Sequence, residues 1–172
     1  GALFSEDQGT LNQYPGGKAG PYVVPDGVEV IDHWAFMGCT NLTGLALPNS
    51  LTEINSRAYE GCLGLTSLVV PADVETIREA AFENCDNLTN IFFLGNAPLC
   101  ENDIFGGMMT GLIPGTVYRI ASASGWPDDQ PGEDEYWNGL PVLVWQVSVL
   151  RVDPTSATIG PEADTLDFDV DN

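Results

Sequence analysis

Residues 65–85 read L-T-S-L-V-V-P-A-D-V-E-T-I-R-E-A-A-F-E-N-C, and residues 42–62 read L-T-G-L-A-L-P-N-S-L-T-E-I-N-S-R-A-Y-E-G-C. The two stretches align without a gap at a spacing of 23 residues, and residues 22–39 form a partial third copy. Each copy has a proline, an alanine followed by an aromatic residue, and a cysteine. These markers are Pro25, Pro48 and Pro71; Ala35-Phe36, Ala58-Tyr59 and Ala81-Phe82; and Cys39, Cys62 and Cys85. A repeat of this length predicts a solenoid, whose coils bury their apolar faces against each other.

One coil can be read from its local pattern. Residues 67–70 alternate as a short strand does, and Pro71 ends that strand because proline lacks the N–H that a ladder requires. Residues 74–77 predict a second extended segment, and residues 78–85 predict a short helix that packs on its neighbours. We therefore expect an α/β solenoid in which each coil contributes a strand, a corner, a short strand and a short helix.

Equivalent positions should stack from coil to coil. Phe36, Tyr59 and Phe82 are expected to form an aromatic column inside the solenoid. The cysteines at this spacing would form a line and not a tetrahedron, so we expect buried free thiols and neither disulfides nor a metal site. By the same count Cys100 occupies an inward isoleucine position.

The repeat changes at both ends. A count of 23 residues from Leu88 and Ile91 reaches Gly111 and Pro114, so the fourth coil is expected to decay. Upstream, residues 20–25 predict the strand of a leading half-coil, and residues 10–15 predict one more strand that caps the open end.

The unit resembles the BspA-type leucine-rich repeat of bacterial surface proteins, roughly L-x-x-I-x-[IL]-P-x-x-[VL]-x-x-I-G-x-x-A-F-x-x-C. This resemblance implies a right-handed leucine-rich-repeat solenoid, located extracellularly or at the cell surface, that binds a host or bacterial surface protein. The family glycine is replaced by Asp32, Asn55 and Arg78. Arginine tolerates a left-handed backbone poorly, so we expect the third corner to differ in shape.

The C-terminal part resembles other segments. Residues 92–141 look like the β-rich cap that closes such arrays, with Trp126 and Trp137 as plugs of the last coil. Residues 147–172 look like the opening strands of a BACON or other bacterial immunoglobulin-like module. We therefore expect a solenoid with its caps over residues 1–146 and a partial β segment over residues 147–172. Unpaired strands in that segment predict docking on another chain, including strand-mediated self-association.

Charge excludes several partners. The chain has 25 acidic and 5 basic residues, for a formal charge of −20. Such a surface repels nucleic-acid phosphates and anionic lipids, and no apolar run is long enough for membrane insertion. The acidic loop at residues 128–135 is interpreted either as a calcium site or as a solvated loop. It lacks the alternating carboxylate spacing of a calcium loop.

No catalytic constellation is found in the sequence. His33 is the one histidine, and it occupies a position where the other repeats have Ser56 and Glu79, so we expect a solvated variable residue. A serine or cysteine nucleophile requires a general base, and no second histidine is available. We therefore expect no enzyme activity and no cofactor.

The outward side of the longer strands is the candidate binding surface. The exposed position of each strand is apolar, and hydroxyl or amide residues flank it; the candidate residues are Val23, Ala46, Ser67, Val69, Asn90 and Phe92. A contiguous apolar stripe on a concave face favours protein binding, although a sheet also tolerates β-branched residues there. The alternative is a glycan-binding accessory protein of a polysaccharide-utilisation system, with Trp126 and Trp137 as stacking residues.

Overall fold

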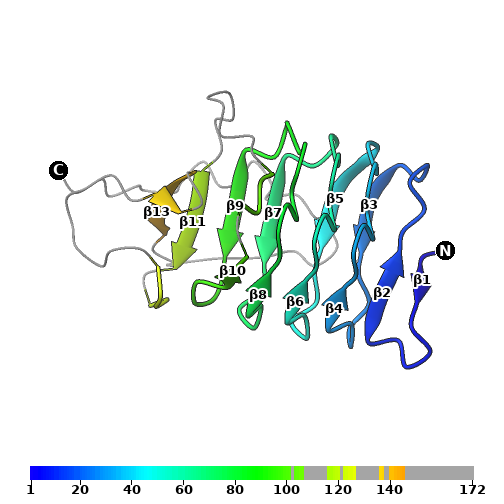
Figure 1. The fold of residues 1–172 in the computed structure, drawn as a ribbon, viewed down its shortest axis with the longest axis horizontal. Coiled ribbons are helices and arrows are strands. Elements are labelled where there is room, and N and C mark those ends of the chain that lie inside the picture. The colour runs from blue at the N-terminus through cyan, green and yellow to red at the C-terminus, as the bar shows by residue number, and fades with distance from the viewer. Residues whose placement is uncertain (102, 107–115, 121, 127–135, 138–139, 146–172) are drawn as a thin grey trace.

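The computed structural model describes residues 1–101, 103–106, 116–120, 122–126, 136–137 and 140–145. Within these residues the chain winds as a β-solenoid, and its strands succeed one another along the long axis from β1 to β13 (Figure 1). The acidic loop 128–135 and the immunoglobulin-like segment 147–172 lie outside the described residues. The predictions made for them remain predictions.

Short strands form one wall of the solenoid. They are β1 (Leu3–Phe4), β2 (Thr10–Gln13), β4 (Val30–Ile31), β6 (Glu53–Ile54), β8 (Thr76–Ile77) and β10 (Leu99–Cys100), which pair in that order. The ladder is parallel except for β1, which folds back on β2. The β2 strand confirms the predicted cap strand, whereas β1 was not predicted. Ile54, Ile77 and Cys100 lie in register, which confirms the inward isoleucine position assigned to Cys100.

Longer strands, together with the two-residue β12, form the opposite wall. They are β3 (Gly20–Val23), β5 (Leu42–Ala46), β7 (Ser67–Val70), β9 (Asn90–Phe93), β11 (Thr116–Ile120), β12 (Tyr136–Trp137) and β13 (Leu140–Trp145). The β3 and β5 strands form one parallel pair, and β7, β9, β11 and β13 form a second parallel ladder with β12 antiparallel at its edge. The β5 strand lies beside β7 (Figure 1), so the two ladders continue one wall, which we call the long sheet.

An aromatic column runs through the interior, as the repeat predicts. The ring centroids of Phe36 and Tyr59 are 5.3 Å apart, and those of Tyr59 and Phe82 are 5.4 Å apart with nearly parallel planes. Tyr14 extends the column at one end and Phe105 at the other. All five side chains are buried, so the column is part of a continuous apolar core.

The third side of each coil is built from turns, and the predicted short helices are wrong for the described residues. The N–H of Phe36 donates to the carbonyl oxygen of Ala58 in the next coil, and the N–H of Tyr59 donates likewise to Ala81. A helix would direct these N–H groups to the carbonyl four residues earlier in the same coil. Hydrogen bonds between coils therefore replace hydrogen bonds within a helix.

Left-handed residues interrupt the same segments. Trp34, Arg57 and Ala80, which are equivalent in the repeat, have φ angles of 57°, 58° and 56°. The expectation that the corner at Arg78 differs from the others is therefore wrong: all three corners are alike, and the left-handed residue comes two positions later. Positive φ breaks a helical run and costs free energy in residues other than glycine.

The spacing between successive long strands increases after β9, while Gly111 and Pro114, on which the expected decay of the fourth coil rests, lie outside the described residues. Val117 of β11 lies opposite Ile91 of β9, an offset of 26 residues, and Val117 is completely buried. The next coil has an offset of 25, because Val142 of β13 lies opposite Val117. A count at the fixed spacing of 23 therefore missed both strands.

Candidate protein-interaction surface

The outward residues of the long sheet form an apolar row, with one segment on each of its two ladders. Backbone register places Val23 opposite Ala46, Val69 opposite Phe92, Phe92 opposite Tyr118, and Tyr118 opposite Leu143. We call these residues the apolar row; they are Val23, Ala46, Val69, Phe92, Tyr118 and Leu143. Val23 is 53% exposed and Leu143 is also exposed, while the four residues between them are half-buried. Both ends of the row are therefore open to solvent.

Two members of the row were missed by the sequence analysis. The rings of Phe92 and Tyr118 stack with centroids 4.6 Å apart and planes inclined by 12°. Tyr118 and Leu143 lie 26 and 25 residues after their neighbours in the row, so a count at a spacing of 23 does not reach them. The signal that could have found Tyr118 is the alternation of apolar residues in T-V-Y-R-I at residues 116–120.

A polar row borders the apolar one. Ser67 lies opposite Asn90, and Asn90 lies opposite Thr116, two residues before the corresponding members of the apolar row. All three side chains are half-buried. The candidate residues Ser67 and Asn90 are thus brought together as predicted, beside an apolar strip and with hydroxyl and amide groups that can hydrogen-bond a partner.

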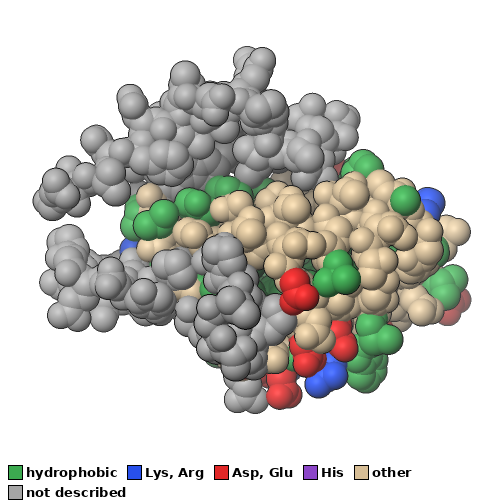
Figure 2. Space-filling view, turned by 90° about the horizontal axis from the view of Figure 1, so that it is seen from above, with side chains coloured by type: hydrophobic (Ala, Val, Ile, Leu, Met, Phe, Trp, Pro, Cys, Tyr) green, Lys and Arg blue, Asp and Glu red, His purple; other side chains and the backbone are tan. Residues whose placement is uncertain are grey.

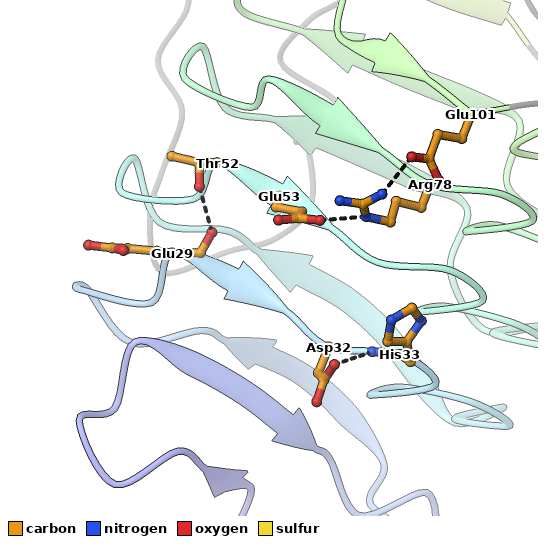
Figure 3. A network of polar contacts seen from close by, with 7 residues as sticks. All are labelled: Glu29, Asp32, His33, Thr52, Glu53, Arg78 and Glu101. Atoms are coloured by element: carbon orange, nitrogen blue, oxygen red, sulfur yellow. Dashed lines mark hydrogen bonds and ion pairs between the residues drawn. The ribbon is translucent and has the colours of Figure 1, made fainter.

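No charged residue occupies an outward position of either row, although the chain carries 25 acidic residues. Charged side chains gather on other sides of the coil. Arg78 donates hydrogen bonds of 2.5 Å to Glu53 and to Glu101 on the short-strand side (Figure 3). The hydrogen bond to Glu53, together with the negative charges of both partners, raises the pKa of Arg78. On the face drawn in Figure 2, most of the visible carboxylates lie toward one edge.

The remaining candidate residues are placed as follows. His33 is exposed, and its backbone N–H donates to Asp32, which fits the predicted solvated position (Figure 3). Trp126 is 4% exposed and packs edge-on against Phe93, so its indole is a plug of the last coil and offers no face to a sugar. Trp137 belongs to β12, but its side chain lies outside the described part of the structure.

No group of three or more His, Cys, Asp or Glu side chains in the described residues is arranged to hold a metal ion. The same residues contain no helix of the length and hydrophobicity that crossing a membrane requires.

A known repeat family matches this chain. The BspA type leucine-rich repeat region matches residues 20–118 in six copies, which is more than half of the chain. The chain therefore belongs to the BspA-type leucine-rich repeat family. The search of curated proteins gave no significant match.

Solved structures agree on the fold alone. A leucine-rich repeat protein of T. pallidum is 21% identical, with a TM-score of 0.52 over 69% of this chain and 67% of that one. A leucine-rich repeat protein from Bacteroides ovatus ATCC 8483 is 24% identical, with a TM-score of 0.51 over 76% of this chain and 31% of that one. The pneumococcal vaccine antigen PcpA is 20% identical, with a TM-score of 0.49 over 69% of this chain and 35% of that one. The chain thus spans about a third of two of these proteins.

Proposed function

We propose that this chain is a non-enzymatic protein-binding module of the adhesion type, which acts outside a bacterial cell or on its surface. The single observation that carries the proposal is the uncharged apolar row on a chain of charge −20. Membership of the BspA-type family supports the same conclusion, since its repeat is a scaffold for protein interaction. The partner is a host or bacterial surface protein.

Charged side chains are absent from the apolar row. Carboxylates keep a protein soluble by preventing close apolar contact, so a face without them is free to associate. The cores of protein interfaces are depleted of charged residues and enriched in aromatic ones. The apolar row fits that description, because Phe92 and Tyr118 present a stacked aromatic pair at its centre.

The experiment is a binding assay against a panel of purified extracellular-matrix proteins. A Val23→Asp, Leu143→Asp double variant places charge at the two exposed ends of the row, where the fold tolerates it. Leu99→Asp is the matched control, because Leu99 is 68% exposed on the short-strand side. Thermal unfolding of each variant verifies that it is folded.

We expect the double variant to lose binding and the Leu99→Asp control to keep it. A carboxylate that the partner covers loses its water without gaining an ionic partner, and this desolvation penalty weakens binding. Unchanged binding by the folded double variant would remove the apolar row from the proposal. The Val69→Asp, Phe92→Asp double variant tests the centre of the row in the same way.

Two parts of the proposal lie outside the described residues. The division into a solenoid over residues 1–146 and a β segment over residues 147–172 remains a prediction, as does self-association through that segment. Sedimentation of the full chain beside a version ending at residue 146 tests both, because only the full chain should self-associate.

A further inference from the structure

The first coil differs from the second at one place on its turn side. In the second coil Arg57 forms ion pairs with Glu60 at 3.6 Å and with Glu83 of the third coil at 3.4 Å. At the positions of Arg57 and Glu60, the first coil has Trp34 and Met37. A charged pair is thus replaced by two large apolar side chains, and both are exposed.

The exposed indole stands on a well-defined turn. Trp34 is 53% exposed and has a φ angle of 57°; its N–H donates to the carbonyl oxygen of Ser56, and its own carbonyl accepts from the N–H of Met37. The ring centroid of His33 lies 5.7 Å from that of Trp34, with the planes inclined by 46°. Backbone hydrogen bonds on both sides therefore fix the turn that carries the aromatic pair. It projects from the turn segment and not from the long sheet.

Polar groups border this aromatic pair. The side-chain amide of Asn12 donates to Asp32 Oδ2 at 3.0 Å, and the N–H of His33 donates to Asp32 Oδ1 at 2.8 Å. Figure 3 shows Asp32 and His33 side by side at the end of β4. The carboxylate, the amide and the imidazole together offer hydrogen-bond acceptors and donors beside an apolar surface.

Size and charge decide what such a site can bind. A stable protein interface needs about 20–30 residues on each side, far more than this cluster supplies. A pyranose ring needs much less, because its C–H face stacks on one indole while its hydroxyls bond to a few polar groups. The chain's charge of −20 disfavours sulfated or carboxylated sugars.

We propose that Trp34 is the stacking residue of a second binding site, which takes a neutral sugar chain. His33 and the Asn12–Asp32 pair supply the hydrogen bonds to its hydroxyls. This site is independent of the apolar row, which lies on a different wall of the coil. It also places sugar binding at Trp34 and not at the buried Trp126.

The test is affinity electrophoresis of the full chain in gels that contain a soluble neutral polysaccharide, with glucan, mannan and arabinoxylan as the panel and alginate as the anionic control. Trp34→Ala removes the indole. Trp34→Arg installs the residue that the second coil carries at the same position, so the fold accommodates it. Leu99→Ala is the control for loss of an exposed apolar side chain.

We expect at least one neutral polysaccharide to retard the wild-type chain and alginate not to do so. Both Trp34 variants should bind at least about tenfold more weakly, and Leu99→Ala should bind as the wild type does. The double variant Val23→Asp, Leu143→Asp should keep sugar binding, so that failure of this proposal and failure of the apolar row are distinguishable. Absence of retardation with the whole panel, or unchanged retardation of both Trp34 variants, would overturn the proposal. If Trp34→Ala loses binding to a matrix protein and the wild-type chain binds no sugar, Trp34 belongs to a protein contact. That result would also overturn the proposal.

Discussion

The thiol of Cys85 donates a hydrogen bond of 2.9 Å to the carbonyl oxygen of Tyr59 in the preceding coil. One coil earlier, Cys62 repeats the contact to Phe36 at 3.1 Å. Both thiols are buried and free, as the repeat spacing predicts. Each thiol therefore joins two coils, because it donates to a carbonyl oxygen that also accepts the backbone N–H of the preceding coil's own cysteine.

Alkaline pH should destabilise the fold through these thiols. Burial raises the pKa of the Cys85 thiol from 9.0 to about 12, and the hydrogen bond with Cys39, together with burial, raises that of Cys62. Above pH 9 the unfolded chain loses these protons while the folded chain keeps them. The free energy of unfolding should therefore fall by about 1 kcal/mol per pH unit per thiol as the pH rises from about 9 towards 12.

Urea unfolding at a series of pH values measures this fall. Cys85→Ala removes one titrating group, so its curve should be flatter than that of the wild type, whatever its stability at pH 7. Tyrosine ionisation lowers the free energy of unfolding equally in the wild type and in Cys85→Ala. The difference between their slopes against pH therefore gives the contribution of the Cys85 thiol. Identical slopes would contradict the role assigned to Cys85.

Tyr59→Phe should stabilise the protein. Tyr59 lies in the middle of the aromatic column, and its hydroxyl is buried without a hydrogen-bond partner. An unsatisfied buried hydroxyl costs about 1–3 kcal/mol, and phenylalanine keeps the stacked ring. We expect the free energy of unfolding to rise by about 1 kcal/mol, with Phe82→Tyr as the reverse change. A lower melting temperature for Tyr59→Phe would show that the hydroxyl is satisfied in solution.

Much of this architecture could be predicted from sequence because equivalent residues in successive coils have the same surroundings. Once Leu65 is inward, every residue 23 positions away is inward, so the core columns and the outward positions followed from one coil. The helices were mispredicted because residues 78–85 have a helical composition, and composition does not show that their N–H groups bond to the next coil. Tyr118 and Leu143 were missed because the last coils are longer, and an insertion shifts every later position.

Gly95→Ala should destabilise the fold. A Cβ atom at Gly95 would lie 2.1 Å from the carbonyl oxygen of Ala72, which is backbone and cannot move aside alone. Crowding of this kind costs about 1–3 kcal/mol. Gly17→Ala is the control, because a Cβ atom there meets no other atom within 4 Å. Chemical unfolding should show a loss of about 2 kcal/mol for Gly95→Ala and almost none for Gly17→Ala. Equal stabilities would mean that the loop after β9 relaxes freely.

Two adjacent alanines should respond differently to glycine. Ala80 has a φ angle of 56°, a conformation that glycine adopts without the steric cost paid by a Cβ atom, whereas Ala81 has no such angle; both side chains are buried. In Ala80→Gly the relief of that cost offsets the lost methyl group and the greater flexibility of the unfolded chain, so the free energy of unfolding should change by less than about 1 kcal/mol. Ala81→Gly should destabilise by about 1–2 kcal/mol, because it loses a buried methyl group and gains unfolded-state freedom with no relief of strain. Chemical unfolding of the two variants measures the difference, and equal losses of stability would show that the left-handed turn carries no strain.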